Sequence, residues 1–173
     1  MMDDMRNPTT KALVATGVFS LAGVISLFMY APTPSYLLPH LIFYGVLVIN
    51  TFFSIRFFSR IAPENTSQIA IDTILVSLYL ALAFSMGRPT QFAFFALCLF
   101  IAASTKYPLL LLVISQTNVL KRKILIDLMG TATCAAVLGA TVIGYSFEAA
   151  WAAAVAFTFA NVYFLLIRPM YRL

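Results

Sequence analysis

The sequence predicts an all-α integral membrane protein with six transmembrane helices, and three observations support this fold class. Hydrophobic residues make up 62% of the 173 residues and charged residues only 10%, whereas soluble domains average roughly 45–50% and about 25%. The apolar residues are gathered in stretches long enough to cross a bilayer, which takes about 20 residues. The connections between these stretches are short, so consecutive helices are expected to run antiparallel.

The predicted spans occupy nearly the whole chain, so we expect one transmembrane helical bundle over residues 1–173 and no extramembrane domain. The spans are expected at about 12–31, 36–58, 68–86, 90–113, 124–145 and 147–167. The first is interpreted as a membrane helix and not as a signal peptide, because it is about 20 residues long and no small-x-small cleavage site precedes Pro32. Asn65 is expected to cap the third helix.

Lysine and arginine are distributed unequally between the two sides of these spans. Nine of the eleven fall on the side that holds both termini, Arg88 falls on the other side, and Lys106 lies inside a span. The positive-inside rule then places both termini in the cytoplasm, most simply of a bacterial inner membrane. The net charge of +5 is interpreted as contact with anionic lipid headgroups. A nucleic-acid partner is not expected, because no basic cluster exceeds three residues.

Two aspartates occupy the same place in two similar apolar stretches, IAIDTIL around Asp72 and ILIDLMG around Asp127. Aligning them brings Lys106 onto Asn161, because each of these residues lies 34 positions after its aspartate, and Asn50 likewise lies 34 positions after Thr16. The chain can therefore be interpreted as three helical hairpins, at about 12–58, 68–113 and 124–167, repeated about an axis along the membrane normal. Chance similarity is the alternative. The candidate polar site consists of Asp72, Lys106, Asp127, Asn161, Asn50 and Thr16.

The expected depth of these side chains suggests how the charges are paired. Both aspartates are predicted near the cytoplasmic ends of their helices, where a charge costs much less than at the bilayer centre and faces the positive end of the helix dipole. Lys106 is separated from the cytoplasm by the mostly apolar residues 107–114, so a partner inside the bundle is expected. Asp72 is the preferred partner. Asp127, or extension of Lys106 towards the headgroups, are the alternatives.

Paired ionisable residues inside a membrane bundle favour a transport function for a solute or an ion. This role requires the polar side chains to converge and line a wet cavity, whereas a purely structural role would keep each pair within its own hairpin. The alternative function is a non-catalytic accessory or scaffold subunit of a larger membrane complex, with a second copy or another membrane subunit as partner.

Two stripes of small residues bear on that alternative, because small side chains let membrane helices approach closely. They consist of Ala132, Ala136, Ala140 and Gly144 in the fifth span, and of Ala152, Ala156 and Ala160 in the sixth. Packing of these two helices on each other is preferred over docking of a partner.

No catalytic signature is present, since the chain contains no HExxH, GxSxG, P-loop or His/Cys metal cluster. We therefore expect neither an enzyme nor a cofactor or metal site, and interpret His40, Cys98 and Cys134 as structural residues. The size, six spans and cytoplasmic termini resemble the substrate-binding subunits of energy-coupling-factor transporters. The alanine motif expected in the first helix of that family is not clear in KALVATGVFSLAGV, so the resemblance transfers no site residue.

Overall fold

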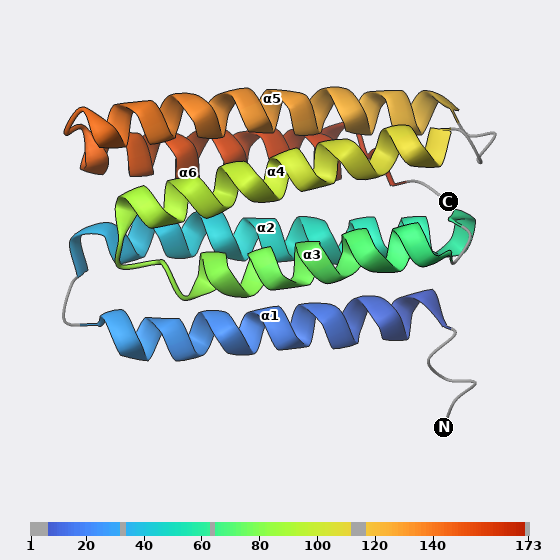
Figure 1. Ribbon diagram of the computed structural model, residues 1–173, viewed down its shortest axis with the longest axis horizontal. Helices are drawn as coiled ribbons and strands as arrows, with labels where there is room; N and C mark the ends of the chain where they lie inside the picture. Colours follow the sequence, from blue (N-terminus) through green and yellow to red (C-terminus); the bar gives the residue numbers. More distant parts are fainter. Residues whose placement is uncertain (1–6, 32–33, 63–64, 112–116, 172–173) are drawn as a thin grey trace.

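The computed structural model describes residues 7–31, 34–62, 65–111 and 117–171, and within them the chain is helical throughout apart from short turns (Figure 1). The helices are α1 (Pro8–Tyr30), α2 (Pro34–Ile61), α3 (Thr66–Ala83), α4 (Pro89–Leu111), α5 (Thr117–Val142), α6 (Ser146–Val162) and the short π-helix η2 (Tyr163–Ile167). In the described chain, six segments are long and apolar enough to cross a membrane. The prediction of an all-helical chain with six helices that could span a membrane is therefore confirmed.

Local polar groups explain where several helices begin and end. The side chain of Asn7 accepts a hydrogen bond from the Thr9 amide at 3.0 Å at the start of α1. Asn65 accepts from the Gln68 amide at 2.8 Å, which confirms it as the predicted cap of α3. After α5 the chain turns through Gly144, whose φ of 102° suits glycine. The Tyr145 amide donates to the Ala140 carbonyl there at 2.9 Å, as in a Schellman motif.

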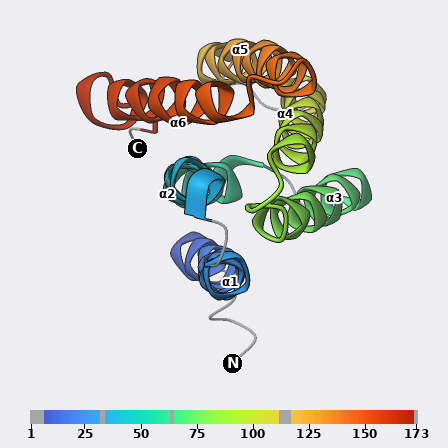
Figure 2. The same ribbon diagram turned by 90° about the vertical axis from the view of Figure 1, so that its left-hand side faces the viewer.

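Consecutive helices run in opposite directions along the bundle (Figure 1). We call the end where α1 begins and η2 ends the terminal end, and the opposite end the distal end. Viewed along the bundle, α2 lies between α1 and α6, and α4 lies between α3 and α5 (Figure 2). Helix α6 lies between α2 and α5 and contacts both.

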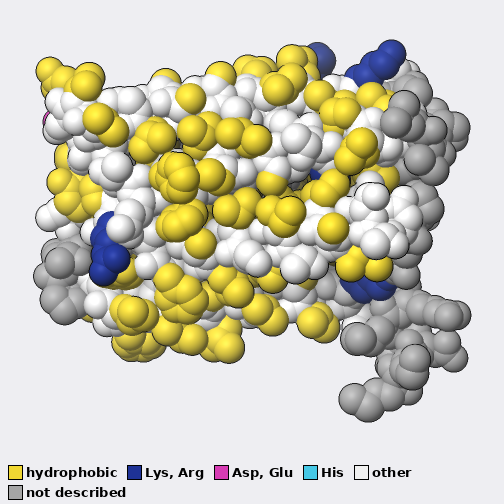
Figure 3. Space-filling view, in the orientation of Figure 1, with side chains coloured by type: hydrophobic (Ala, Val, Ile, Leu, Met, Phe, Trp, Pro, Cys, Tyr) yellow, Lys and Arg dark blue, Asp and Glu magenta, His cyan; other side chains and the backbone are white. Residues whose placement is uncertain are grey.

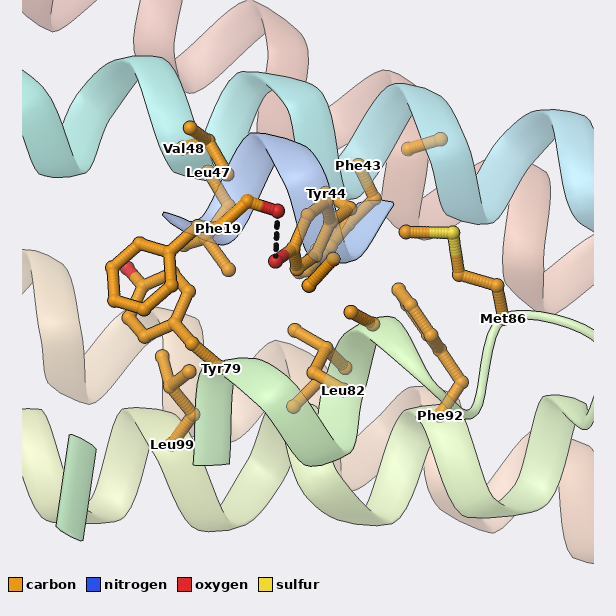
Figure 4. Packing of buried hydrophobic residues seen from close by; sticks show 14 of the residues in the cluster. Phe19, Phe43, Tyr44, Leu47, Val48, Tyr79, Leu82, Met86, Phe92 and Leu99 are labelled. Atoms are coloured by element: carbon orange, nitrogen blue, oxygen red, sulfur yellow. Dashed lines mark hydrogen bonds between the residues drawn. The ribbon is translucent and has the colours of Figure 1, made fainter. Parts of the chain in front are cut away.

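The main hydrophobic core extends from the middle of the bundle towards the distal end (Figure 4). The rings of Phe19 and Tyr79 stack with their centroids 4.4 Å apart, and the Tyr44 hydroxyl donates to the Phe19 carbonyl at 3.0 Å. Leu82 and Met86 are fully buried beside them. This layer joins α1, α2, α3 and α4 and closes the middle of the bundle.

The outer faces of the helices carry large apolar side chains, as lipid contact requires. Phe28 is 75% exposed and Leu166 is 74% exposed, and on the face in Figure 3 the lysine and arginine side chains lie mainly near the two ends of the bundle. Many serine and threonine hydroxyl groups within the spans are satisfied by their own helices. For example, Thr158 donates to the Ala154 carbonyl at 2.7 Å.

Helices α5 and α6 contact each other as expected, but most of the small-residue stripes do not form the contact. Ala132 and Ala136 of α5, and Ala152 and Ala156 of α6, are exposed on the outside of the bundle. The face of α6 that is buried is instead the one carrying Ala150 and Ala154. The helices use small residues for close packing, but on a neighbouring face.

The largest boundary difference concerns α5, which begins at Thr117 and not near residue 124. Lys121, Arg122 and Lys123 are therefore helical residues and do not belong to a connection. Each charge is accommodated differently: Lys121 is exposed, and the Arg122 guanidinium lies 5.3 Å from the centroid of the Phe164 ring. Lys123 is buried. Arg6 and Arg172, which contributed to the predicted orientation, lie outside the described residues.

Candidate functional site

A cavity of about 470 Å³ lies between α1, α2, α3, α4 and α5 at the terminal end. This volume falls in the range of about 300–1,000 Å³ that is typical of small-molecule sites. Half of the 24 described residues that line it are polar or ionisable. The polar and ionisable residues that line it are Lys11, Asn50, Thr51, Ser54, Ser59, Gln68, Asp72, Tyr79, Lys106, Tyr107, Lys123 and Asp127.

Two ion pairs face this cavity, and the first joins α3 to α4. The Lys106 ammonium donates to a carboxylate oxygen of Asp72, so the pairing predicted from depth is present. The Asp72 side chain is 54% exposed, while that of Lys106 is 16% exposed. Asp72 therefore lies at the open part of the cavity, and Lys106 reaches it from the wall.

The second pair lies within α5. Lys123 and Asp127 are four residues apart, which places them on one face of the helix, and the Lys123 ammonium donates to Asp127 Oδ1 at 2.6 Å. Both side chains are buried, with exposures of 7% and 1%. Asp127 lies ten residues after the start of α5, or about 15 Å along the helix. The expectation that Asp127 lies near the helix end is therefore wrong, because α5 begins earlier than predicted.

Hydroxyl groups of tyrosines line the wall next to these pairs. Thr51 donates its proton to the Leu47 carbonyl at 2.8 Å, so Tyr79, which is hydrogen-bonded to Thr51, must be the donor in that contact. The Tyr107 and Ser54 hydroxyls are 3.1 Å apart, and the Lys123 ammonium lies 5.3 Å from the centroid of the Tyr107 ring. Helices α2, α3 and α4 thus each contribute neutral polar groups around the charged pair of α5.

Tyr171 adds a further aromatic ring near this wall, after the last membrane span. Its ring centroid lies 5.8 Å from that of Phe57, and burial raises the pKa of its hydroxyl. The Tyr171 side chain is therefore neutral at physiological pH. The end of the described chain therefore packs against α2 near the terminal end.

The inner end of the cavity is closed by the hydrophobic core. Phe19, Leu47, Tyr79, Leu99 and Phe100 belong both to the cavity wall and to the core cluster. The Phe19–Tyr79 stack crosses from α1 to α3 at this level (Figure 4). The cavity therefore does not cross the bundle.

Beyond the core, on the distal side, His40 packs with Met86 and Phe92 in a second layer of buried side chains. Its Nδ1–H donates to the Met86 carbonyl, and its ring stacks on Phe92 with centroids 4.0 Å apart. The void beside it measures only about 20 Å³, which is room for about one water molecule. The distal side is thus sealed by packed side chains, and His40 has the structural hydrogen bond that the sequence predicts.

Four of the six predicted site residues line the cavity, namely Asn50, Asp72, Lys106 and Asp127. The other two are hydrogen-bonded within their own helices: Thr16 donates to the Ala12 carbonyl at 2.7 Å, and Asn161 donates to the Phe157 carbonyl at 2.8 Å. Positions that the repeat relates to one another therefore differ in their contacts. The threefold hairpin repeat stays a prediction.

Sequence reasoning missed Lys123, because it was assigned to a connection together with its basic neighbours. The four-residue spacing to Asp127 was the signal that indicated a helical pair.

Sequence reasoning also missed Gln68, whose buried Oε1 has no hydrogen-bond partner among the described residues. Within the same residues, no group of three or more metal-ligating side chains comes together, and Cys98 and Cys134 are free thiols.

Comparison with known proteins does not place the chain in a family. No protein-family description, no curated protein and no solved structure matches it.

Proposed function

We propose that this protein transports a small solute or ion across a membrane, and that the cavity at the terminal end is its binding site. The observation that carries this proposal is the convergence of two Lys–Asp pairs, from α3, α4 and α5, on one cavity of small-molecule size. Ionisable groups are costly in a bilayer and mark transport pathways in many membrane proteins.

The exposure of the Asp72–Lys106 pair supports a binding role over a structural one. An ion pair with a half-exposed carboxylate contributes only about 0–1 kcal/mol to stability, so it holds α3 and α4 together weakly. The same exposure leaves the Asp72 carboxylate accessible from outside the bundle, whereas the Lys123–Asp127 pair is buried.

The closed inner end favours a carrier over a permanently open channel. The core around Phe19 and Tyr79 and the layer around His40 block the distal side of the cavity. Transport then requires the bundle to alternate between this arrangement and one in which the distal side opens. We propose that α1 to α5 rearrange around the two ion pairs during this change.

We further propose that the terminal end faces the cytoplasm of a bacterial inner membrane. Arg56, Arg60, Lys121, Arg122 and Arg168 belong to the parts of α2, α5 and the chain after η2 that lie at this end, whereas Arg88 lies exposed at the start of α4, at the distal end. This distribution follows the positive-inside rule, and it places basic side chains beside anionic headgroups.

Osmotic swelling of liposomes that contain the purified protein tests the transport function with several classes of solute. Vesicles are challenged with iso-osmotic monocarboxylates, alkylammonium salts or sugars, and light scattering reports entry. We expect swelling with one of these classes, and a large loss of the rate in Asp72→Asn and in Lys106→Met. Glu148→Gln, which changes an exposed carboxylate of α6 outside the cavity, should retain the rate. No swelling with any class, or equal rates in all variants, contradicts the proposal.

The accessory-subunit alternative is supported by the exposure of the small-residue stripes on α5 and α6, which leaves that face available for another membrane helix. Purification in a mild detergent distinguishes the two functions. A stoichiometric membrane partner that stays bound, together with absence of transport by the chain alone, would favour the accessory role. A transport-active chain without a partner would exclude it.

A further inference from the structure

One oxygen of the buried aspartate in the cavity wall lacks the hydrogen bonds that a buried carboxylate normally has. Asp127 Oδ1 accepts from Lys123 at 2.6 Å, whereas Oδ2 is buried and has no donor among the described residues. A carboxylate has about four acceptor sites, and buried polar atoms almost always have partners. Oδ2 of Asp127 therefore has unused acceptor sites, and it is the atom of the pair that can bind a proton.

Lys123 has the complementary property, since it has more donors than contacts. Its ammonium carries three N–H groups, of which one is directed to Asp127 Oδ1. The Tyr107 ring lies on another side, with its centroid 5.3 Å away, and both residues line the cavity. A carboxylate-bearing solute in the cavity can therefore accept a hydrogen bond from Lys123 while Lys123 stays in place.

Charge balance couples these two events. The Lys123–Asp127 pair is neutral as a whole, and an uncompensated charge in a buried site costs several kcal/mol. An anion that joins the pair alone would leave one excess negative charge, whereas a proton on Asp127 removes it. A cation beside Asp127 would instead lie next to the Lys123 ammonium and would leave the pair with one excess positive charge.

We propose that the cavity binds a small organic monocarboxylate together with one proton, the carboxylate on the Lys123 ammonium and the proton on Asp127 Oδ2. This inference rests on the proposed transport function and names its substrate class. The proton comes from the water at the mouth of the cavity and forms an O–H bond on Oδ2, Lys123 keeps its charge, and both proton and anion leave on release. The stoichiometry of one proton to one anion follows from the single buried pair.

The other titratable groups around the pair do not replace Asp127 in this role. Tyr79 of α3, Tyr107 of α4 and Tyr171 after η2 face the same region, and phenols remain neutral at physiological pH. Asp72 is half-exposed and bound to Lys106, and Lys11 lines the cavity nearer its mouth. Helix α6 contributes no residue to the described cavity lining.

Uptake into proteoliposomes tests this inference. The probes are radiolabelled pyruvate, gluconate and benzoate as monocarboxylates, methylammonium and choline as cations, and glucose as a neutral solute. We expect uptake of at least one monocarboxylate, stimulated when the outside is more acidic than the lumen. In Asp127→Asn the stimulation should be lost while exchange of the same anion across equal pH continues. Glu148→Gln, with its carboxylate outside the cavity, should keep the stimulation.

A second measurement keeps the test valid if Asp127→Asn folds poorly. Infrared difference spectra of the protein in lipid should show a protonated carboxyl band that grows when the transported anion is added at constant pH. This band should persist in Glu148→Gln and shift in frequency in Asp127→Glu. Its absence in the wild type, or transport of a cation or sugar and no monocarboxylate, overturns the inference but leaves the proposed function standing. If no probe moves, the proposed function itself fails.

Discussion

Asp127 accepts a hydrogen bond from the ammonium of Lys123, which lies one turn earlier in the same helix. Both side chains are buried in the wall of a cavity. The pair needs no second helix to form, because the four-residue spacing alone brings the two groups together. Helix α5 can therefore carry one positive and one negative charge deep into the bundle as a neutral unit. Removing either charge alone would break this neutrality.

The first prediction concerns stability. Asp127→Leu or Lys123→Met alone leaves its partner buried and unpaired, so each should lower the free energy of unfolding by about 3–5 kcal/mol. The double variant removes both charges and should recover most of this loss. Asp72→Asn, in the half-exposed pair, should cost only about 0–1 kcal/mol. Thermal unfolding in detergent measures all four variants, and additive losses in the double variant would contradict the coupling.

The second prediction tests whether the cavity holds water. After Cys98 and Cys134 have been replaced by alanine, Ser54→Cys places a thiol in the cavity wall, and Ile49→Cys places one on the lipid-facing side of the same helix, where Ile49 is 54% exposed. A membrane-impermeant thiol reagent should label Ser54→Cys much faster, because the thiolate is the reactive form and needs water. Similar rates for both variants would show that water does not fill the cavity.

The same cysteine variant reports the orientation of the bundle. Intact cells and inside-out vesicles expose opposite sides of the membrane to the impermeant reagent. With a cytoplasmic terminal end, Ser54→Cys should be labelled in inside-out vesicles and protected in intact cells. Labelling in intact cells alone would reverse the proposed orientation.

The fourth prediction concerns the contact between α4 and α5 beside the cavity. A Cβ added at Gly130 would lie 2.5 Å from Cδ1 of the Phe100 ring, which is a steric clash. Gly130→Ala should therefore lower the free energy of unfolding by about 1–3 kcal/mol, as overpacking does. Gly139→Ala is the matched control in the same helix, since nothing lies within 4 Å of its added Cβ. It should be neutral or stabilising by up to about 1 kcal/mol, as thermal unfolding can check.

The fifth prediction concerns the distal seal. His40→Leu leaves the buried Met86 carbonyl without the donor that His40 supplies, so it should cost about 1–3 kcal/mol of stability. If the distal side must open during transport, this variant should also alter the transport rate although it lies far from the charged cavity. An unchanged rate together with the expected loss of stability would assign His40 a purely structural role.

The fold was predictable from the sequence where hydropathy alone decides the structure. Six apolar segments cannot remain in water, and short connections leave them few arrangements. The Asn65 cap was predictable because an asparagine just before an apolar helical segment is commonly the N-cap of that helix. The Asp72–Lys106 pair followed from depth, since a lysine separated from the headgroups by residues 107–114 needs a partner.

The remainder of the site depended on information that hydropathy does not contain. Lys123 belongs to a basic triplet, which is typical of a connection, and only the contacts of α5 show that its charge is neutralised inside the bundle. Thr16 and Asn161 have the polarity of site residues, but each satisfies its hydrogen bond on its own helix. The four-residue spacing of small residues likewise identified the stripes, but it did not show which face of each helix would be buried.

The pairing of opposite charges on α5 has an electrical consequence. A membrane potential does work on a moving group in proportion to its net charge, about 2.3 kcal/mol per elementary charge per 100 mV. Lys123 and Asp127 sum to zero, and they still sum to zero after one proton and one monovalent anion have joined them. The voltage across the bilayer would therefore neither drive nor oppose the movement of this pair, so the proposed transport is expected to be electroneutral and driven by the gradients of solute and protons.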